Sequence, residues 1–165
     1  MITKRIEDAI NVQINNEFYA SYLYLSMSAN CERMNLAGFA HWCRLQHQEE
    51  WAHAMKLVEF LNDNGGALRL KTIKQPPHTF RTPLAIFEHG LAHEMDVTQR
   101  IYTLHQLAVK EKSFATQVML QWFISEQVEE EKSGRQVVEQ LKMIEDSKAA
   151  LLVLDRELAA RTNIE

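Results

Sequence analysis

The chain has 165 residues, of which 46% are hydrophobic and 24% are charged, and its formal net charge is −4. This balance predicts one globular domain, and the lack of a basic cluster argues against nucleic acid as a partner, because phosphate contacts require clustered lysine and arginine. No apolar run approaches the roughly 20 residues that span a bilayer, and the first residues lack an apolar signal segment. We therefore expect a cytoplasmic protein with no membrane partner.

Long stretches without proline and with few glycines predict helices, because most of the few helix-breaking residues lie between residues 65 and 83. Asn35 is expected to cap the second helix, and Gly65 is expected to stop it. Thr82 is the expected cap of the third helix, with Pro83 in its first turn, and Ser147 is the expected cap of a short fifth helix. The expected helices cover residues 3–33, 36–64, 83–111, 114–145 and 148–162.

The connection at residues 65–81 is long and has little helical or strand pattern, whereas the other joints are only a few residues. Short joints make antiparallel hairpins, so the long connection must carry the chain back along the bundle. The sequence therefore predicts an all-α fold, in one domain over residues 1–165. It is a four-helix bundle over residues 3–145 with one long crossover, followed by the short fifth helix at residues 148–162.

One set of polar residues occurs twice along the chain with the same offset. Glu17, Glu50 and His53 are followed, each 77 positions later, by Glu94, Gln127 and Glu130. All six interrupt apolar stripes that would otherwise face the core, for example Ile6, Ile10, Ala20, Tyr24 and Cys31 around Glu17.

The six residues also lie close to the midpoints of their expected helices, so they can meet at one level of the bundle. An uncompensated buried carboxylate would cost several kcal/mol of desolvation, so a cation is expected among them. The repeat therefore predicts a two-metal site. Carboxylates with one imidazole suit Fe, Mn or Zn, and the lack of thiolate disfavours copper(I) and iron–sulfur chemistry.

With these residues in hand, the chain resembles the bacterial non-haem ferritins over essentially its whole length. The segments that carry the resemblance are residues 16–24, residues 48–53, Glu94 and residues 121–131. The resemblance implies a di-iron ferroxidase centre. One iron would bind Glu17, Glu50 and His53, the other would bind Glu50, Glu94 and Glu130, and Gln127 would stand beside the second.

The same resemblance implies a third, weaker iron site at Glu49, Glu126 and Glu129, shared with Glu130. The alternative for these acids is that they are solvated on helix surfaces. Tyr24 follows Glu17 by seven residues on the same helix face, which places its ring near the irons. In similar ferritins the equivalent tyrosine supplies an electron during oxygen reduction, with a tryptophan at the position of Trp122 close by.

The second half of the motif lacks the Glu-x-x-His pair of the first half. A neutral amide at Gln127 and a carboxylate at Glu130 are expected to hold the second iron less firmly, which favours a site that iron leaves after oxidation. Haem is not expected, because Trp51 and Ala52 stand where haem-binding relatives present an axial methionine.

The resemblance implies an iron-storage protein that oxidises Fe(II) with O2 or H2O2 and mineralises it inside a shell of 24 identical subunits. An apolar strip on the fifth helix, comprising Ala150, Leu151, Leu154 and Leu158, is expected to contact other subunits, with docking onto its own bundle as the alternative. Two other functions remain open: a non-storage di-iron peroxidase or oxidase of the rubrerythrin kind, and a purely structural bundle. No role is expected for His41, His47, His78, His89, His93 and His105.

Overall fold

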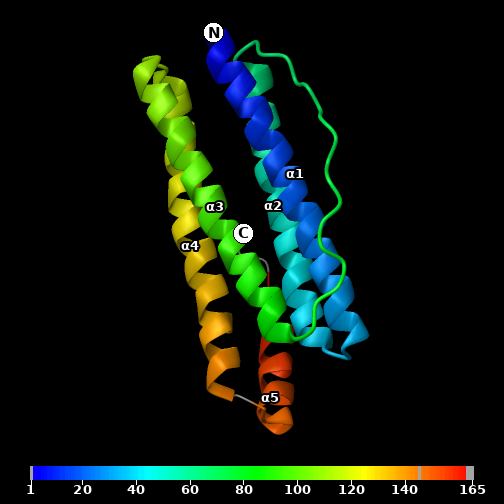
Figure 1. Cartoon of the computed structure of the whole chain (residues 1–165). Helices are drawn as coiled ribbons and strands as arrows, with labels where there is room; N and C mark the ends of the chain where they lie inside the picture. Colours follow the sequence, from blue (N-terminus) through cyan, green and yellow to red (C-terminus); the bar gives the residue numbers. More distant parts are fainter. Residues whose placement is uncertain (1, 145, 163–165) are drawn as a thin grey trace.

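The computed structural model describes residues 2–144 and 146–162, and all the regular secondary structure in these ranges is helical. Helices α1 to α4 lie side by side as a bundle, and α5 lies at the end of the bundle where α4 finishes (Figure 1). The predicted all-α fold with a long crossover and a short fifth helix is therefore confirmed. The helices are α1 (Lys4–Arg33), α2 (Ala37–Asp63), α3 (Pro83–Lys110), α4 (Phe114–Ile144) and α5 (Lys148–Ala159).

Most helix boundaries lie within one residue of the predicted ones, and one differs by more. The fifth helix ends at Ala159, three residues before the expected end. Residue 145, the expected last residue of the fourth helix, lies outside the described residues, as do the outermost positions of the predicted domain at residues 1 and 163–165.

The crossover between α2 and α3 runs along α1 and connects opposite ends of the bundle (Figure 1). The side chain of Asn11 fixes its start: Nδ2 donates to the carbonyl of Ala67 at 2.9 Å, and Oδ1 accepts from the backbone N–H of Arg69 at 2.6 Å. Further along, the hydroxyl of Ser26 donates to the carbonyl of Pro77 at 2.7 Å. These bonds satisfy polar groups of a segment that forms no regular structure of its own.

Three of the predicted helix boundaries follow local chemistry, as expected. The hydroxyl of Thr82 accepts from the N–H of Ala85 at 3.1 Å, and that of Ser147 accepts from Ala150 at 3.3 Å. Gly65 follows the end of α2 with a φ of 71°, a left-handed conformation that glycine adopts without steric cost.

The predicted N-cap of α2 is wrong. Asn35 has a φ of 58° and belongs to the turn that ends α1, while the capping position is occupied by Leu36, which makes no side-chain cap bond. Asp155 of α5 caps the helix instead: its Oδ1 accepts from the N–H groups of Gly38 at 2.8 Å and Phe39 at 3.0 Å. The first turn of α2 is thus completed by a residue distant in sequence.

Glycine is required at position 38 by this contact. A Cβ atom there would lie 1.6 Å from the main-chain oxygen of Asp155, far inside van der Waals contact. The two helices therefore approach each other backbone to backbone.

The hydrophobic core is divided into two clusters along the bundle. One includes Ile10, Leu57 and Phe123, and the other includes Met27 and Phe39 together with parts of α5. A layer of buried polar residues lies between them, and it includes all six residues of the repeated motif: Glu17, Glu50, His53, Glu94, Gln127 and Glu130.

The apolar strip of α5 contacts its own bundle. Leu154 and Leu158 are buried in the second cluster, and Leu151 packs against it. Leu152 and Val153, on the other side of α5, are 52% and 63% exposed. The predicted apolar strip thus docks onto its own bundle, which was the alternative to a contact with other subunits. A different face of α5 is free within the subunit. None of the helices in the described ranges is long and apolar enough to cross a membrane.

Asp155→Ala is expected to lower the free energy of unfolding by about 1–2 kcal/mol, because the first N–H groups of α2 lose their acceptor. Asp155→Asn keeps an acceptor oxygen and is expected to lose less. Denaturant unfolding at one fixed protein concentration measures both, with Glu157→Ala on the exposed face of α5 as the control. Equal stability of Asp155→Ala and the control would contradict the capping role.

Candidate metal centre

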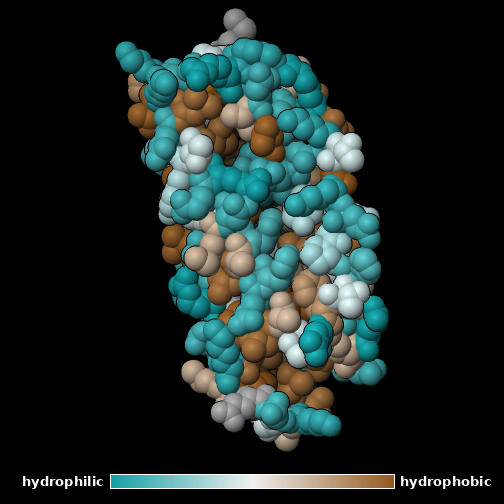
Figure 2. All heavy atoms as spheres, in the orientation of Figure 1, coloured by the Kyte–Doolittle hydropathy of each residue, from teal (hydrophilic) through white to brown (hydrophobic). Residues whose placement is uncertain are grey.

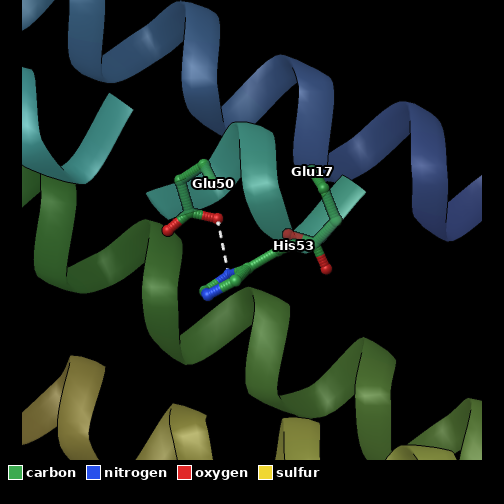
Figure 3. A group of neighbouring side chains, drawn as sticks. All are labelled: Glu17, Glu50 and His53. Carbon is green, nitrogen blue, oxygen red and sulfur yellow. Dashed lines mark ion pairs between the residues drawn. The ribbon is translucent and has the colours of Figure 1, made fainter. Parts of the chain in front are cut away.

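Glu17, Glu50 and His53 form a compact group of potential metal ligands between α1 and α2. One ligand atom of each lies within 4.8 Å of the others, and the three residues are 1%, 1% and 5% exposed. Glu50 and His53 occupy successive positions on one face of α2, with His53 Nδ1 3.5 Å from Glu50 Oε2, and Glu17 reaches toward them from α1 (Figure 3). The residues predicted for the first metal are therefore brought together.

The residues predicted for the second metal are buried at the same polar layer but are arranged differently. Glu94 of α3 is held by two neighbours: its Oε1 accepts from the Tyr24 hydroxyl at 2.7 Å, and its Oε2 accepts from Gln127 Nε2 at 3.3 Å. Glu130 of α4 accepts from Gln46 Nε2 at 2.6 Å.

Neither of the two groups of potential metal ligands found in the described part of the chain includes Glu94. The second group instead joins His53 with Glu126 and Glu130. The predicted combination of Glu50, Glu94 and Glu130 is thus not assembled within the 4.8 Å that defines these groups. The hydrogen bonds from Tyr24 and Gln127 account for the position of the Glu94 carboxylate.

Two carboxylate oxygens of the centre, Glu17 Oε2 and Glu50 Oε1, are buried and have no hydrogen-bond partner among the protein groups described. Buried polar atoms are normally paired, because an unpaired one forfeits its hydration without compensation. A divalent cation that prefers oxygen and imidazole ligands would pair both oxygens and use the adjacent His53 nitrogen. The donor set therefore fits a metal ion such as ferrous iron.

Burial sets the protonation of these groups. It raises the pKa of Glu17 to about 7, although the hydrogen bond from Gln13 opposes this shift. Burial, reinforced by repulsion from Glu94 and Glu130, raises the pKa of Glu50 well above its usual range. Burial lowers the pKa of His53 to about 4, so at neutral pH the imidazole is uncharged and has a lone pair for a metal. A metal ion would displace protons from the carboxylates.

Several residues that support the centre were missed in the sequence, although spacing marks them. Gln13 stands four residues before Glu17 and donates to its Oε1 at 2.7 Å. Thr98 stands four residues after Glu94 and donates to its main-chain oxygen at 3.0 Å. Polar residues at i±4 from a buried acid share its helix face, which is the signal that could have identified them.

Tyr24 and Trp122 lie at the centre, as predicted. The Tyr24 hydroxyl bonds to Glu94, and burial together with the surrounding carboxylates raises the pKa of the phenol well above its usual value, so it remains protonated. The Trp122 ring lies 5.4 Å from the His53 ring, centroid to centroid, and Lys56 Nζ lies 4.1 Å from the Trp122 ring centroid.

The acids predicted for a third metal line one groove beside the centre, of about 530 Å³. Glu126 approaches His53 and Glu130, whereas the Glu129 side chain is 68% exposed and lies 3.7 Å from Lys132 Nζ. Glu49 has a different partner, because its Oε2 bonds to Nη2 of Arg161 at 2.8 Å. No local pattern in the sequence indicated this ion pair.

Three of the residues without an assigned role have structural partners. Trp51 is 53% exposed and packs against Phe18, with ring centroids 5.0 Å apart. His47 bonds through Nδ1 with the hydroxyl of Ser21 at 2.7 Å. His93 packs edge-on against the ring of Tyr19.

In metal-free protein, Glu17→Gln is expected to stabilise the fold relative to the parent more at high pH than at low pH. The gain in free energy of unfolding is expected to be larger at about pH 8 than at about pH 5 by on the order of 2 kcal/mol. The folded pKa of Glu17, about 7, exceeds the ordinary value of 4.5, so protonation stabilises the fold at low pH and this stabilisation is lost as pH rises through 7. The amide cannot ionise and still accepts from Gln13. Denaturant unfolding of chelator-treated protein at both pH values measures the difference.

Titration of His53 occurs in both proteins and cancels in this comparison. Glu59→Gln, at an exposed position of α2, is the matched control. A stability difference between Glu17→Gln and the parent that did not change with pH would contradict the raised pKa.

Comparison with known proteins agrees with this geometry. The ferritin-like domain family matches residues 7–144. A bacterial non-heme ferritin from Staphylococcus saprophyticus is 41% identical over 98% of this chain and 97% of its own, and one from Staphylococcus epidermidis is 40% identical over 98% of each. The open pore ferritin of Archaeoglobus fulgidus superposes with a TM-score of 0.97 and is 46% identical, over 98% of this chain and 99% of its own. A humanized archaeal ferritin superposes with a TM-score of 0.98 and is 46% identical, over 100% of both chains. The chain belongs to the ferritin family.

Proposed function

We propose that this protein stores iron: it binds Fe(II), oxidises it to Fe(III) and retains it as a ferric mineral inside a hollow shell. The observation that supports this most directly is the buried group of Glu17, Glu50 and His53, in which two carboxylate oxygens have no protein partner. The relatives named as non-heme ferritins support the same function.

The first ferrous ion would bind Glu17, Glu50 and His53. The second would bind Glu50, Glu94 and Glu130, with Gln127 beside it, once the Glu94 carboxylate exchanges a hydrogen bond for the ion. Two ferrous ions give up one electron each, and the two electrons with two protons convert O2 to H2O2, or H2O2 to two waters. Because the carboxylates carry raised pKa values, iron binding would release protons beside the oxidant.

The two halves of the centre are proposed to hold iron with different strengths. The first half offers an uncharged imidazole and two unpartnered oxygens, whereas Glu94 and Glu130 already accept hydrogen bonds from Tyr24, Gln127 and Gln46. Ligands with existing partners must give them up to bind a metal. A weaker second half favours passage of iron through the site over permanent occupancy.

Iron leaving the centre is proposed to pass the groove of Glu49, Glu126, Glu129 and Glu130. His53 and Glu130 border both the centre and this groove, which makes the groove continuous with it. A third, weaker iron site at Glu49, Glu126 and Glu129 fits this route. Weak binding by partly exposed carboxylates suits an ion in transit.

Storage requires an assembly, and a homo-oligomer of 24 subunits is proposed. Large hydrophobic side chains are exposed on the single subunit, among them Leu70 at 70%, Phe114 at 74% and Val153 at 63%. Hydrophobic residues also gather toward the α5 end of the face seen in Figure 2. Such surfaces are typical of subunit contacts. Cytoplasmic location stays a prediction, which cell fractionation would test.

Glu17→Ala and His53→Ala are each expected to slow the fast phase of aerobic Fe(II) oxidation by roughly 10- to 100-fold, because each removes one ligand of the first iron. The variants are expected to elute in size-exclusion chromatography as the same large assembly as the parent. Stopped-flow absorbance of Fe(III) formation in the near ultraviolet measures the fast phase.

Glu59→Ala, on the exposed side of α2, is the control and should oxidise iron as fast as the parent. An unchanged fast phase in either ligand variant would contradict the assignment of the centre. A parent protein that eluted as a monomer or small oligomer would contradict storage.

Tyr24→Phe tests the proposed electron donor. The phenyl ring keeps the packing but lacks the oxidisable hydroxyl, so the fast phase is expected to slow several-fold. Loss of the hydroxyl also frees one oxygen of Glu94, so anaerobic Fe(II) binding is not expected to weaken. Electron paramagnetic resonance of rapidly frozen parent protein is expected to contain a tyrosyl radical signal that Tyr24→Phe lacks. The same signal in both proteins would contradict the role of Tyr24.

A further inference from the structure

Arg161, two residues beyond the end of α5, places its guanidinium group beside the acidic groove. Its Nη2 lies 2.8 Å from Glu49 Oε2, and both side chains are mostly buried, at 18% and 20% exposed. Its carbon Cζ lies 4.6 Å from the ring centroid of Trp42, and its main-chain oxygen lies 2.9 Å from His41 Nε2. Both the main chain and the side chain of this residue are therefore held in place.

The other guanidinium nitrogen of Arg161, Nη1, is buried and has no hydrogen-bond partner among the described protein groups. The groove that Arg161 lines also contains Glu126, Glu129 and Glu130. Lys56, the other basic residue of the groove, lies over the ring of Trp122. Arg161 is thus the basic residue that pairs with a groove carboxylate, and part of its hydrogen-bonding capacity is unused.

We propose that Arg161 is the resident counter-cation of the third metal site and that a divalent ion binding at Glu49 must displace it. The inference rests on the proposed function, because Arg161 would set the affinity of the groove for iron that leaves the centre. Arginine does not lose its proton in proteins, so displacement requires movement of the side chain rather than deprotonation. The guanidinium has no second bonded carboxylate, so its displacement breaks one ion pair and the contact with the Trp42 ring.

The affinity of the third site is then set by competition between Arg161 and the divalent ion for the Glu49 carboxylate. While Arg161 is paired with Glu49, the groove carries one negative charge fewer toward an incoming ion, and the guanidinium repels that ion. When the ion leaves, the ion pair forms again. The groove would then accept iron from the centre without retaining it.

Binding of Zn²⁺ to the assembled protein tests the inference, because zinc takes the same carboxylate and imidazole ligands but has no redox chemistry. Isothermal titration resolves a tight class of sites, expected at the centre, and a weaker class, expected at the groove. Arg161→Gln is expected to tighten the weaker class roughly tenfold and to leave the tight class unchanged. Arg161→Lys keeps the charge and is expected to stay close to the parent.

Two controls assign the effect to this ion pair. Arg156→Gln removes a charge from the exposed face of α5 and should change neither class. In a Glu49→Gln background, the effect of Arg161→Gln should shrink, because no Arg161–Glu49 pair then has to be broken and only the repulsion by the guanidinium remains. Thermal unfolding verifies that all variants are folded.

A weaker class that is unchanged in Arg161→Gln, or tightened equally by Arg156→Gln, would overturn the inference. Crystals of the parent protein give a readout that needs no variant. The Arg161–Glu49 bond should be intact without zinc and broken when zinc is bound at Glu49. An intact bond beside bound zinc would also overturn the inference. Absence of the tight class in the parent would instead count against the proposed centre, so the two failures are distinguishable.

Discussion

Burial of several carboxylates in the middle of an apolar bundle is the constraint on which the rest of this structure depends. The polar layer separates two hydrophobic clusters, so its groups have little access to water. Isolated from water, carboxylates become protonated, as the raised pKa of Glu17 indicates, or they acquire a cation. The fold is stable enough to carry this cost because apolar side chains fill the bundle on both sides of the layer.

The same constraint explains the difference between the two halves of the centre. In the first half, oxygens of Glu17 and Glu50 are left without partners close to a neutral imidazole. In the second half, Tyr24 and Gln127 satisfy Glu94. An internal repeat of sequence has thus produced one half prepared for a metal ion and one half whose ligands must first exchange partners. Such an asymmetry suits oxidation followed by release.

Helix α5 has a larger part in the subunit than its length suggests. Asp155 completes the first turn of α2, and Arg161 reaches the groove beside the centre. Both contacts place α5 against the helix that carries Glu50 and His53. A change in the docking of α5 would therefore alter the start of α2 and the charge of the groove together.

The sequence by itself determined the helices, the hairpin pairing and the level of the polar layer. These follow from short-range physics: apolar periodicity selects the buried face, and capping residues such as Thr82 and Ser147 bond within their own first turn. The positions of Glu17, Glu50 and His53 near the midpoints of the first two helices then placed them at one level of the bundle. The resemblance to ferritins added the expected metal and the division of ligands between irons.

Only the tertiary structure decided the orientation of Glu94, the cap of α2 and the partner of Glu49. Each depends on residues far apart in sequence, and their approach is set by the angles at which whole helices dock. A pattern of three or four residues contains no information about those angles. Asn35 had the right chemistry to cap α2 but the turn gave it a left-handed backbone, and Asp155 took its place because α5 packs backbone to backbone against Gly38.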